Sequence, residues 1–368
     1  MIYAVLFALV FTGAVFMITV YNAVSAPMLK NGAAPSAFPA VSVLVPARNE
    51  AETIGGCVGS LLAQDYPGLE IIVLDDGSQD NTAAIVHELS VTDRRVRLIT
   101  GKALPPGWTG KNWACSQLAK HAGGGILIFT DADNRHEPDA VLKTVWWMEK
   151  LHLDLFSAFP QQITHTLAEK LVVPSVYMTV YSYLPLRLTY LLPFPSLAAA
   201  NGQWLAFTRK AYTELNAHEA AKAQVVEDTW IARFAKKQGK KILTAAGTGA
   251  VYSRMYTGWR QVWNGFSKNL FGLMGYNAPA FILLLLVMLA AYVLPYACLF
   301  YRGLLLPALA GVALNIAVRL VLSMKYRDPL ITAVLHPAAV LATVATGIHS
   351  MYAHFRGTVT WKGRKVSV

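Results

Sequence analysis

ILIFTDADNRHEP (residues 126–138) joins a short apolar run to two carboxylates that stand one residue apart. The run Ile126–Phe129 has the length and composition of a buried strand, and Asp131 and Asp133 follow where that strand would reach solvent. Because side chains two residues apart in an extended segment point the same way, both acids can face one ligand. The stretch therefore predicts a buried strand that ends at a polar site.

The same order, an apolar strand followed by polar residues, occurs twice upstream. VSVLVP runs into PARNE, and LEIIVLDD runs into DDGSQDNT. The elements predicted from apolar spacing are strands at 41–46, 69–76, 96–100 and 125–133 and helices at 50–64 and 82–90. This alternation predicts an α/β fold with a mostly parallel sheet that helices cover on both faces.

Acidic residues stand at the carboxyl ends of two of the predicted strands: Asp75, Asp76, Asp131 and Asp133. The carboxyl ends of parallel strands meet at one edge of a sheet, where such sheets bind ligands. Gathered carboxylates repel one another unless a cation or a hydrogen-bonding ligand is present. Because Mg²⁺ and Mn²⁺ favour carboxylates and keep phosphate oxygens as ligands, the edge predicts a nucleoside diphosphate bridged by a divalent cation. Each motif alone is weak evidence, since Asp and Gly also favour ordinary turns.

Apolar residues make up 55% of the 368 residues and concentrate at both ends, while charged residues make up 14%. Residues 2–20 carry no charge and are long enough for a helix that crosses the hydrocarbon core. We expect a transmembrane anchor at 1–24 and a linker at 25–39. A cleaved signal peptide ending at Ala26 is the alternative, but no Lys or Arg precedes the apolar run and Pro27 would follow the cut.

The C-terminal third contains three further apolar segments: 278–300, 303–322 and 330–352. They predict a transmembrane region over 278–355, in which Arg319 needs an interfacial or paired position. If all three segments cross, the basic tail 356–368 lies on the opposite side from the predicted α/β domain (40–257), against the positive-inside rule. Either one segment is then re-entrant or the rule fails here.

Two more segments suggest contact with a membrane. Residues 258–277 carry the aromatic and basic residues of an interfacial amphipathic helix. Residues 171–192 are apolar enough to resemble a span, but Pro174, Pro185 and Arg187 argue against one. We expect that stretch to dip toward the bilayer instead.

The net charge of +11 fits an anionic membrane surface or an anionic substrate. No basic run or nucleic-acid motif accompanies it, so nucleic acid is not an expected partner. Cys57, Cys115 and Cys298 lie far apart without metal-type pairing, which indicates reduced thiols in a cytosol-facing or membrane context.

Four motifs in order, PARNE (46–50), DDGSQDNT (75–82), TDAD (130–133) and VVED (225–228), resemble those of family 2 glycosyltransferases with the GT-A fold. The resemblance covers roughly residues 40–270. Its membrane-bound branch, which includes hopanoid-associated and diaponeurosporenoate (carotenoid) glycosyltransferases, is similar in three narrower stretches: GWTGKNWACSQ (107–117), RMYTGWRQVWNGFSKN (254–269) and TWKGRKVSV (360–368). The resemblance implies a Rossmann-like mixed sheet with helices on both faces, and transmembrane helices at both ends.

The resemblance also implies roles for residues at matching positions. Donor-binding residues would be Pro46, Arg48, Glu50, Asp75, Asp76, Lys111, Asp131 and Gly202. Lys111 would meet the diphosphate as a point charge, with a solvated loop lysine as the alternative. Gly202 would permit close approach of the donor sugar. Asp133, with Asp131, would ligate a divalent cation, Mg²⁺ or Mn²⁺.

On the acceptor side, the resemblance makes Asp228 the general base that deprotonates the acceptor hydroxyl. The alternative is that acids in a first helical turn only offset the helix dipole. Glu227, Arg254 and His218 are possible contacts with acceptor or phosphate, and a surface histidine is the alternative for His218. Many relatives carry a Gly-Gly pair before these acids, and its absence here predicts a reshaped acceptor side.

The implied function is inverting transfer of a sugar from a nucleotide-sugar donor, expected to be a UDP-sugar, to a membrane lipid or isoprenoid of hopanoid or carotenoid type. The implied location is the plasma membrane, with several spans and a cytoplasmic catalytic domain. A polysaccharide synthase or a polyprenyl-phosphate glycosyltransferase is one alternative, although the Q-x-x-R-W motif typical of processive synthases is absent. A catalytically silent membrane scaffold that retains the fold is the other.

Overall fold

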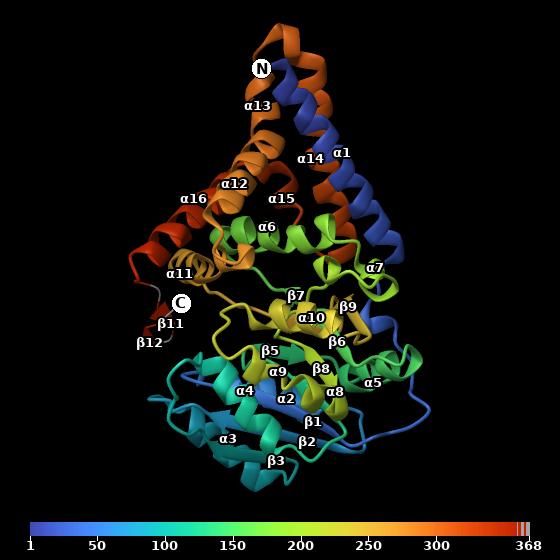
Figure 1. The fold of residues 1–368 in the computed structure, drawn as a ribbon, viewed down its shortest axis with the longest axis vertical. Helices are drawn as coiled ribbons and strands as arrows, with labels where there is room; N and C mark the ends of the chain where they lie inside the picture. Colours follow the sequence, from blue (N-terminus) through green and yellow to red (C-terminus); the bar gives the residue numbers. More distant parts are fainter. Residues whose placement is uncertain (359, 362–363, 366–368) are drawn as a thin grey trace. The chain divides into compact units, whose positions relative to one another are not determined.

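Figure 1 shows the fold in a computed structural model, which describes residues 1–358, 360–361 and 364–365. The chain forms two compact units. The α/β unit contains Pro27–Gln161 and Leu186–Arg254, and the helical unit contains Met1–Ala26, Gln162–Pro185 and Met255–Val368. Most of the terminal TWKGRKVSV stretch lies outside the described residues.

The main sheet of the α/β unit has seven strands in the order β3-β2-β1-β4-β8-β6-β9. β1 pairs in parallel with β2 and β4, whereas β8 runs antiparallel to β4 and β6. In chain order these strands are β1 (Val41–Ala47), β2 (Leu69–Asp75), β3 (Val96–Thr100), β4 (Ile126–Phe129), β6 (Leu155–Phe159), β8 (Leu205–Thr208) and β9 (Ile242–Ala246). The expected α/β class with a mixed, mostly parallel sheet is confirmed.

A smaller sheet has the order β5-β10-β7. Its strands are β5 (Asn134–His136), β10 (Val251–Ser253) and β7 (Gln161–Gln162). β5 begins directly after Asp133, so the two acids that follow β4 lie in a tight connection between the two sheets. This connection fixes where those acids point.

Helices cover both faces of the main sheet (Figure 1). Val43 and Val45 of β1 join the core beneath one layer of helices, and Leu44 joins the core on the opposite face, as the two-residue period of a strand requires. The first layer contains α2 (Ile54–Leu62), α3 (Thr82–Thr92) and α5 (Ala140–Lys150). The second contains α4 (Gly110–His121), α8 (Arg209–Leu215), α9 (Ala217–Ala220) and α10 (Glu227–Lys237).

The beginning of the predicted linker packs onto the edge of this sheet. Ala246 of β9 donates its N–H to the carbonyl of Pro27 at 2.9 Å, and Met28 forms a parallel bridge with Ala246. Leu29, which begins η1 (Leu29–Asn31), is fully buried. Two short elements, α7 (Leu186–Leu191) and η2 (Pro195–Leu197), complete the unit.

The helical unit consists of helices with short connections (Figure 1), most of them apolar, whereas α11 is amphipathic. They are α1 (Ile2–Ser25), α6 (Leu167–Tyr183), α11 (Trp259–Asn269), η3 (Gly272–Met274), α12 (Ala278–Tyr292), α13 (Leu294–Cys298), η4 (Arg302–Leu304), α14 (Leu305–Tyr326), α15 (Ile331–Val334) and α16 (His336–Phe355). Two short strands, β11 (Thr360–Trp361) and β12 (Arg364–Lys365), pair in antiparallel orientation near the C-terminus.

Within the described residues, two helices are long and apolar enough to cross a membrane, Ile2–Ser25 and Arg302–Tyr326. A third span results if Trp259–Met274 and Ala278–Tyr292, which meet at 113°, are counted as one broken span rather than a re-entrant loop. The apolar segment predicted at 278–300 forms two helices, α12 and α13, with a break between them. Pro295 lacks the N–H that would continue the helix, and its ring clashes with the preceding turn.

Polar contacts join the helices of this unit. Asn22 of α1 donates to the carbonyls of Tyr181 and Leu184 at 2.8 Å each, so α1 is anchored to α6 and its following turn. Arg319 of α14 is fully buried and is paired, as expected for a charge in an apolar helix. Its guanidinium donates to His336 Nδ1 at 3.0 Å and to the carbonyl of Pro174 at 3.2 Å.

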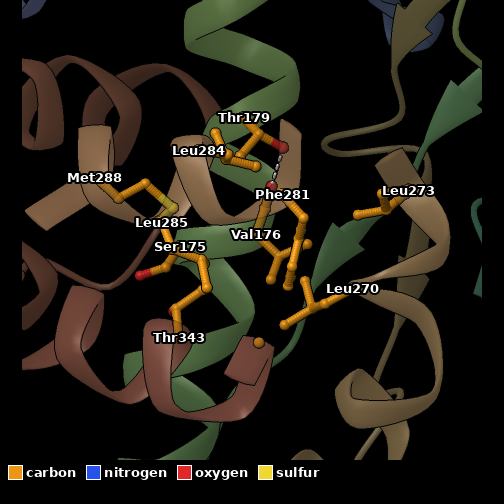
Figure 2. A pocket seen from close by; sticks show the side chains of 11 residues that line it. Ser175, Val176, Thr179, Leu270, Leu273, Phe281, Leu284, Leu285, Met288 and Thr343 are labelled. Carbon is orange, nitrogen blue, oxygen red and sulfur yellow. Dashed lines mark hydrogen bonds between the residues drawn. The ribbon is translucent and has the colours of Figure 1, made fainter. Parts of the chain in front are cut away.

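An apolar pocket of about 50 Å³ lies among α6, α12 and α16 (Figure 2). Val176 and Thr179 line it from α6, Phe281 and Met288 from α12, and Gly347 from α16. Ordinary ligand sites measure roughly 300–1,000 Å³. In this conformation the pocket therefore admits only a small apolar group.

Candidate active site

The loops that follow β1 and β2 hold each other through hydrogen bonds. Asn49 has a left-handed backbone (φ 52°), which Asn tolerates better than most residues. Its side chain accepts the N–H of Gln79 at 2.8 Å, and its own N–H donates to Ser78 Oγ at 3.0 Å. Glu50 donates its N–H to Thr82 Oγ1 at 2.8 Å. PARNE and DDGSQDNT therefore form one joined rim at the carboxyl edge of the sheet.

The expected nucleoside-binding residues are built into this rim. The Arg48 guanidinium donates to the carbonyl of Asp76 and, at 3.1 Å, to the carbonyl of Gly77. Asp75 and Asp76 are buried, with 9% and 6% of their surface exposed. Pro46 lies in β1 beside Leu74 of β2. The structure thus brings Pro46, Arg48, Glu50, Asp75 and Asp76 to one edge.

Asp131 and Asp133 follow β4 at the same edge. Asp133 Oδ1 is buried and has no hydrogen-bond partner among the described residues. Burial, together with the negative charges of Asp131 and Glu50, holds the pKa of Asp133 well above its usual range. An unpartnered buried carboxylate oxygen is costly, so this atom indicates a site for a ligand that the protein alone does not supply.

These two acids fit an open cation site better than a closed cage. In the part of the chain that the structure describes, no group of three or more His, Cys, Asp or Glu side chains is placed to hold a metal ion. Asp131 and Asp133 offer carboxylates, the ligand type that Mg²⁺ and Mn²⁺ prefer. The other positions around such an ion would fall to water and to substrate phosphate oxygens.

Lys111 connects Asp131, which follows β4, with Glu227 of α10. It lies in the first turn of α4, which Thr109 caps by accepting the N–H of Asn112. Its ammonium is 2.9 Å from Asp131 Oδ1 and 3.3 Å from Glu227 Oε1. Burial opposes the charge, but the two carboxylates outweigh it and hold the pKa of Lys111 well above its usual value. Lys111 is therefore an ion-paired residue of the site and not a solvated loop lysine.

Gly202 lies beside Lys111, Glu227 and Asp228. Its N–H donates to Asp228 Oδ2 at 2.8 Å. A Cβ at this position would lie 3.0 Å from Lys111 Nζ and 3.3 Å from Glu227 Oε1. The glycine therefore leaves room for the ion pair between Lys111 and Glu227 beside the backbone.

Asp228 is a carboxylate with a raised pKa beside Gly202. It lies in the first turn of α10, where its Oδ1 also accepts the N–H of Thr229 at 2.7 Å. Burial and the neighbouring Glu227 raise the pKa of Asp228 to about 6, against the lowering effect of Lys111 and the backbone N–H groups. A carboxylate with a pKa close to neutrality accepts a proton more readily than an ordinary one.

Residues 42–215 match the family model for Glycosyl transferase family 2. These residues form a family 2 glycosyltransferase domain. A 4,4'-diaponeurosporenoate glycosyltransferase from Staphylococcus haemolyticus is 28% identical over 241 residues, which cover 62% of this chain and 60% of that protein. The protein of the same name from Staphylococcus aureus is 26% identical over 345 residues, covering 89% of this chain and 88% of that protein.

The glycosyltransferase fold also appears among solved structures. A mannosyltransferase from Pyrobaculum calidifontis, in complex with GDP-Man and Mn²⁺, aligns over 95% of this chain and 98% of its own, with a TM-score of 0.59 and 19% identity. Within the glycosyltransferase domain lie Asp131, Asp133, Lys111 and Gly202. Asp228 lies beyond the matched residues, although it contacts Gly202 inside them.

The structure also places the two other expected residues, His218 and Arg254. His218 is 2% exposed and packs against Phe129 and Tyr212, whose hydroxyl is 3.0 Å from His218 Nδ1. The alternative of a surface histidine is therefore wrong, because α9 turns this side chain into the core. Burial and the charge of Lys111 lower the pKa of His218 to about 3, so it is neutral. Arg254 follows β10 at the end of the α/β unit.

Sequence reasoning missed the residues that support the glycosyltransferase site from behind. Thr130 and Asn134 flank the two acids and are fully buried, and His136 is 6% exposed. A weak signal was present, since Thr130, Asn134 and His136 are polar residues close to a buried apolar strand. Their partners on another loop could not be found from spacing, because that loop lies about 70 residues further along the chain.

Proposed function

We propose that this glycosyltransferase is inverting and metal-dependent, and that it moves a sugar from a nucleotide-sugar donor to a lipid or isoprenoid acceptor. The observation that carries the proposal is the arrangement around Gly202, where Lys111 and Asp228 lie beside one backbone position without a side chain. Such an arrangement combines a cation for a diphosphate with a proton acceptor for a nucleophile.

The donor would lie along the carboxyl edge of the sheet. Pro46, Arg48 and Asp76 would line the nucleoside pocket, in the rim that the loops after β1 and β2 form together. Lys111 would contact the diphosphate, and its present partner Asp131 would approach the ribose or the cation. A UDP-sugar remains our expected donor, and the GDP-Man bound by the Pyrobaculum enzyme makes a GDP-sugar the first alternative.

Asp133, with Asp131, would hold Mg²⁺ or Mn²⁺. The buried, unpartnered Oδ1 of Asp133 supports this assignment, and the Mn²⁺ in the Pyrobaculum enzyme is consistent with a divalent cation. When bound, such an ion neutralises charge on a departing phosphate group.

In the transfer step, the acceptor oxygen forms a bond to the anomeric carbon as the bond from that carbon to the diphosphate oxygen breaks. Asp228 takes the proton of the acceptor hydroxyl, and the nucleoside diphosphate leaves with the electron pair. Lys111 stabilises the negative charge on the leaving group. Attack from the face opposite the leaving group inverts the anomeric centre.

A lipid-type acceptor is supported by the names of the relatives and by the apolar helices. Both staphylococcal relatives are named for 4,4'-diaponeurosporenoate. Two helices of the described part of the chain could cross a membrane. The hydrogen bond from Asn22 holds α1 to α6, which favours a retained anchor over a cleaved signal peptide. We place the protein in the plasma membrane with several spans and the α/β unit in the cytoplasm.

The chemical group that accepts the sugar is a separate question. The suffix of diaponeurosporenoate denotes a carboxylate, which has no proton to give up at neutral pH. In this chain Glu227 and Asp228 stand side by side, and two acids would repel an approaching carboxylate. The raised pKa of Asp228 is useful only for a nucleophile that carries a proton. We therefore favour a hydroxyl acceptor over a carboxylate.

The deciding experiment incubates membranes that contain the protein with labelled UDP- and GDP-sugars and a divalent cation, followed by mass analysis of extracted lipids. We expect a singly glycosylated lipid from the wild type and none from Asp228→Asn or Asp133→Ala. A water-soluble product alone would contradict a lipid acceptor, and a long sugar chain would favour a polysaccharide synthase. Full activity in both variants would contradict the mechanism, and an inactive wild type would favour a scaffold.

A further inference from the structure

A buried set of polar side chains lies directly behind the acids that follow β4. We call it the positioning cluster, and it contains Ser60, Thr130, Asn134, His136 and the backbone carbonyl of Gln203. No part of the proposed chemistry uses these groups, although each one is at least partly buried in the α/β unit. Buried polar side chains of this kind are costly unless they are fully hydrogen-bonded, so their presence calls for a physical reason.

The hydrogen bonds of the cluster cross from one loop of the site to another. Thr130 Oγ1 donates to the carbonyl of Gln203 at 2.9 Å, and Asn134 Nδ2 donates to the same carbonyl at 2.5 Å. Asn134 Nδ2 also donates to Thr130 Oγ1 at 3.0 Å. Thr130 and Asn134 flank Asp131 and Asp133 in the sequence, and Gln203 follows Gly202. The cluster therefore ties the loop of the donor acids to the loop that contacts Asp228.

Counting protons shows that His136 completes this connection as a neutral ring. The single hydroxyl proton of Thr130 is used on Gln203, so His136 Nε2 donates to Thr130 Oγ1, 3.1 Å away. The other ring nitrogen, Nδ1, lies 2.9 Å from Ser60 Oγ, whose single proton has two acceptors within reach, Nδ1 and the carbonyl of Cys57 at 2.8 Å. Burial, with the charge of Arg135, lowers the pKa of His136 to about 3, which agrees with an uncharged ring. Each hydroxyl and ring nitrogen in the connection has a partner, whereas Asn134 Oδ1 is buried and has none among the described residues.

Hydrogen bonds also hold the loop that contains Gly202 and Gln203. Gly202 donates its N–H to Asp228 Oδ2 at 2.8 Å, and Gln203 donates its N–H to Asn201 Oδ1 at 2.8 Å. The side chain of Gln203 donates to Ser253 Oγ at 2.7 Å. One peptide segment, 201–203, thus contacts Asp228 through one residue and the positioning cluster through the next.

We infer that Thr130, Asn134 and His136 are positioning residues that set the distance between the donor acids Asp131 and Asp133 and the acceptor-side base Asp228. The inference rests on the proposed function, since it needs a donor held by Asp131 and Asp133 and an acceptor proton taken by Asp228. In a direct displacement the acceptor oxygen, the anomeric carbon and the leaving oxygen must be aligned. A shift of about 1 Å between the two sides can lower such a rate by roughly 100-fold.

The test compares Thr130→Val, which keeps the shape of the side chain and removes its hydroxyl, with Thr130→Ser, which keeps the hydroxyl. For Thr130→Val we expect kcat for transfer to fall by about 10–100-fold, with the KM for the donor within about threefold of the wild type. Because the donor is still bound but the base is displaced, hydrolysis of the donor by water should rise relative to transfer. Thr130→Ser should restore both the rate and the transfer-to-hydrolysis ratio.

Thr189→Val is the matched control. Thr189 is also fully buried in the α/β unit, but its hydroxyl bonds to the carbonyl of Leu186, away from the cluster. Ser60→Ala is a second, milder variant for the case in which Thr130→Val does not fold, and it should lower kcat by about 3–10-fold with an unchanged donor KM.

Three outcomes would overturn the inference. The first is a loss of kcat in Thr130→Val that is no larger than the loss in Thr189→Val. The second is a donor KM in Thr130→Val that rises in step with the fall in kcat. The third is a transfer-to-hydrolysis ratio that Thr130→Val leaves unchanged. A wild type that transfers no sugar to any lipid would contradict the proposed function itself. An active wild type with insensitive cluster variants would contradict only the positioning role.

Discussion

Lys111 Nζ lies 2.9 Å from Asp131 Oδ1 and so pairs with one of the two acids that follow β4. The same ammonium is 3.3 Å from Glu227 Oε1, so one cation serves acids that stand almost 100 residues apart in the sequence. A residue expected to meet the diphosphate thus also joins an acid that follows β4 to an acid beside Gly202.

Replacing Lys111 should change both the rate and its dependence on pH. Lys111→Met removes the charge that lowers the pKa of Asp228, so that pKa should rise further and the acidic limb of the kcat profile should move to higher pH. We also expect kcat to fall at least about tenfold through lost stabilisation of the leaving group. Lys111→Arg is the control that keeps the charge, and its acidic limb should stay in place. An acidic limb that does not move in Lys111→Met would contradict an effect of the Lys111 charge on the pKa of Asp228.

The pH profile of the wild type should report the protonation of Asp228. A general base works only when deprotonated, and the pKa of this group is raised to about 6, so kcat should rise about tenfold per pH unit below 6 and level off above it. Asp228→Asn should lower kcat by about 100- to 10,000-fold for a hydroxyl acceptor and remove this limb. If the true acceptor is a carboxylate, Asp228→Asn should retain most of its activity, and our preference for a hydroxyl would be wrong.

Adding one methyl group at Gly202 should damage activity more than stability. The new Cβ would lie 3.0 Å from Lys111 Nζ, which must move by a few tenths of an ångström and so leave its place beside Asp131 and Glu227. We expect Gly202→Ala to lose about tenfold in kcat, with the free energy of unfolding changed by about 1 kcal/mol or less. Gly59→Ala, in α2 with nothing near the added atom, is the control and should be neutral or slightly stabilising.

Removing the charge of Asp133 should separate stability from function. Without a cation, this carboxylate is held beside Asp131 and Glu50, and its Oδ1 lacks a partner in the described chain. Asp133→Asn relieves that repulsion, so in chelator we expect it to be more stable by about 1 kcal/mol, or roughly 2–4 °C in the melting temperature. With Mn²⁺ or Mg²⁺ added, only the wild type should gain stability and transfer sugar. A wild type that is equally active in chelator would contradict metal dependence.

The buried Arg319 should be important for the helical unit. Arg319→Met would leave the carbonyl of Pro174, Ser175 Oγ and His336 Nδ1 without their donor. We expect a loss of about 2–4 kcal/mol in stability, measured by thermal unfolding in detergent, because buried partners of a charged group are left unsatisfied. Arg302→Met is the control, since Arg302 is exposed and should have little effect.

The order of strands and helices in the first half of the α/β unit followed from local patterns. Strands were predicted at 41–46 and 69–76 and are found at Val41–Ala47 and Leu69–Asp75. A strand buried on both faces needs a continuous apolar run, and polar residues can appear only where it ends. The positions of Asp75, Asp131 and Asp133 at one edge follow from the same rule, because parallel strands end together.

What the sequence by itself determined was therefore the α/β class, the apolar helices and the acids at the strand ends, since each depends on neighbours within a few residues. Only the tertiary structure decided that Lys111 bridges Asp131 and Glu227, that His218 turns into the core, and that Thr130 reaches the loop at Gln203. These contacts join residues far apart in the chain. Their geometry depends on how the sheet and its two layers of helices pack, and no local spacing records it.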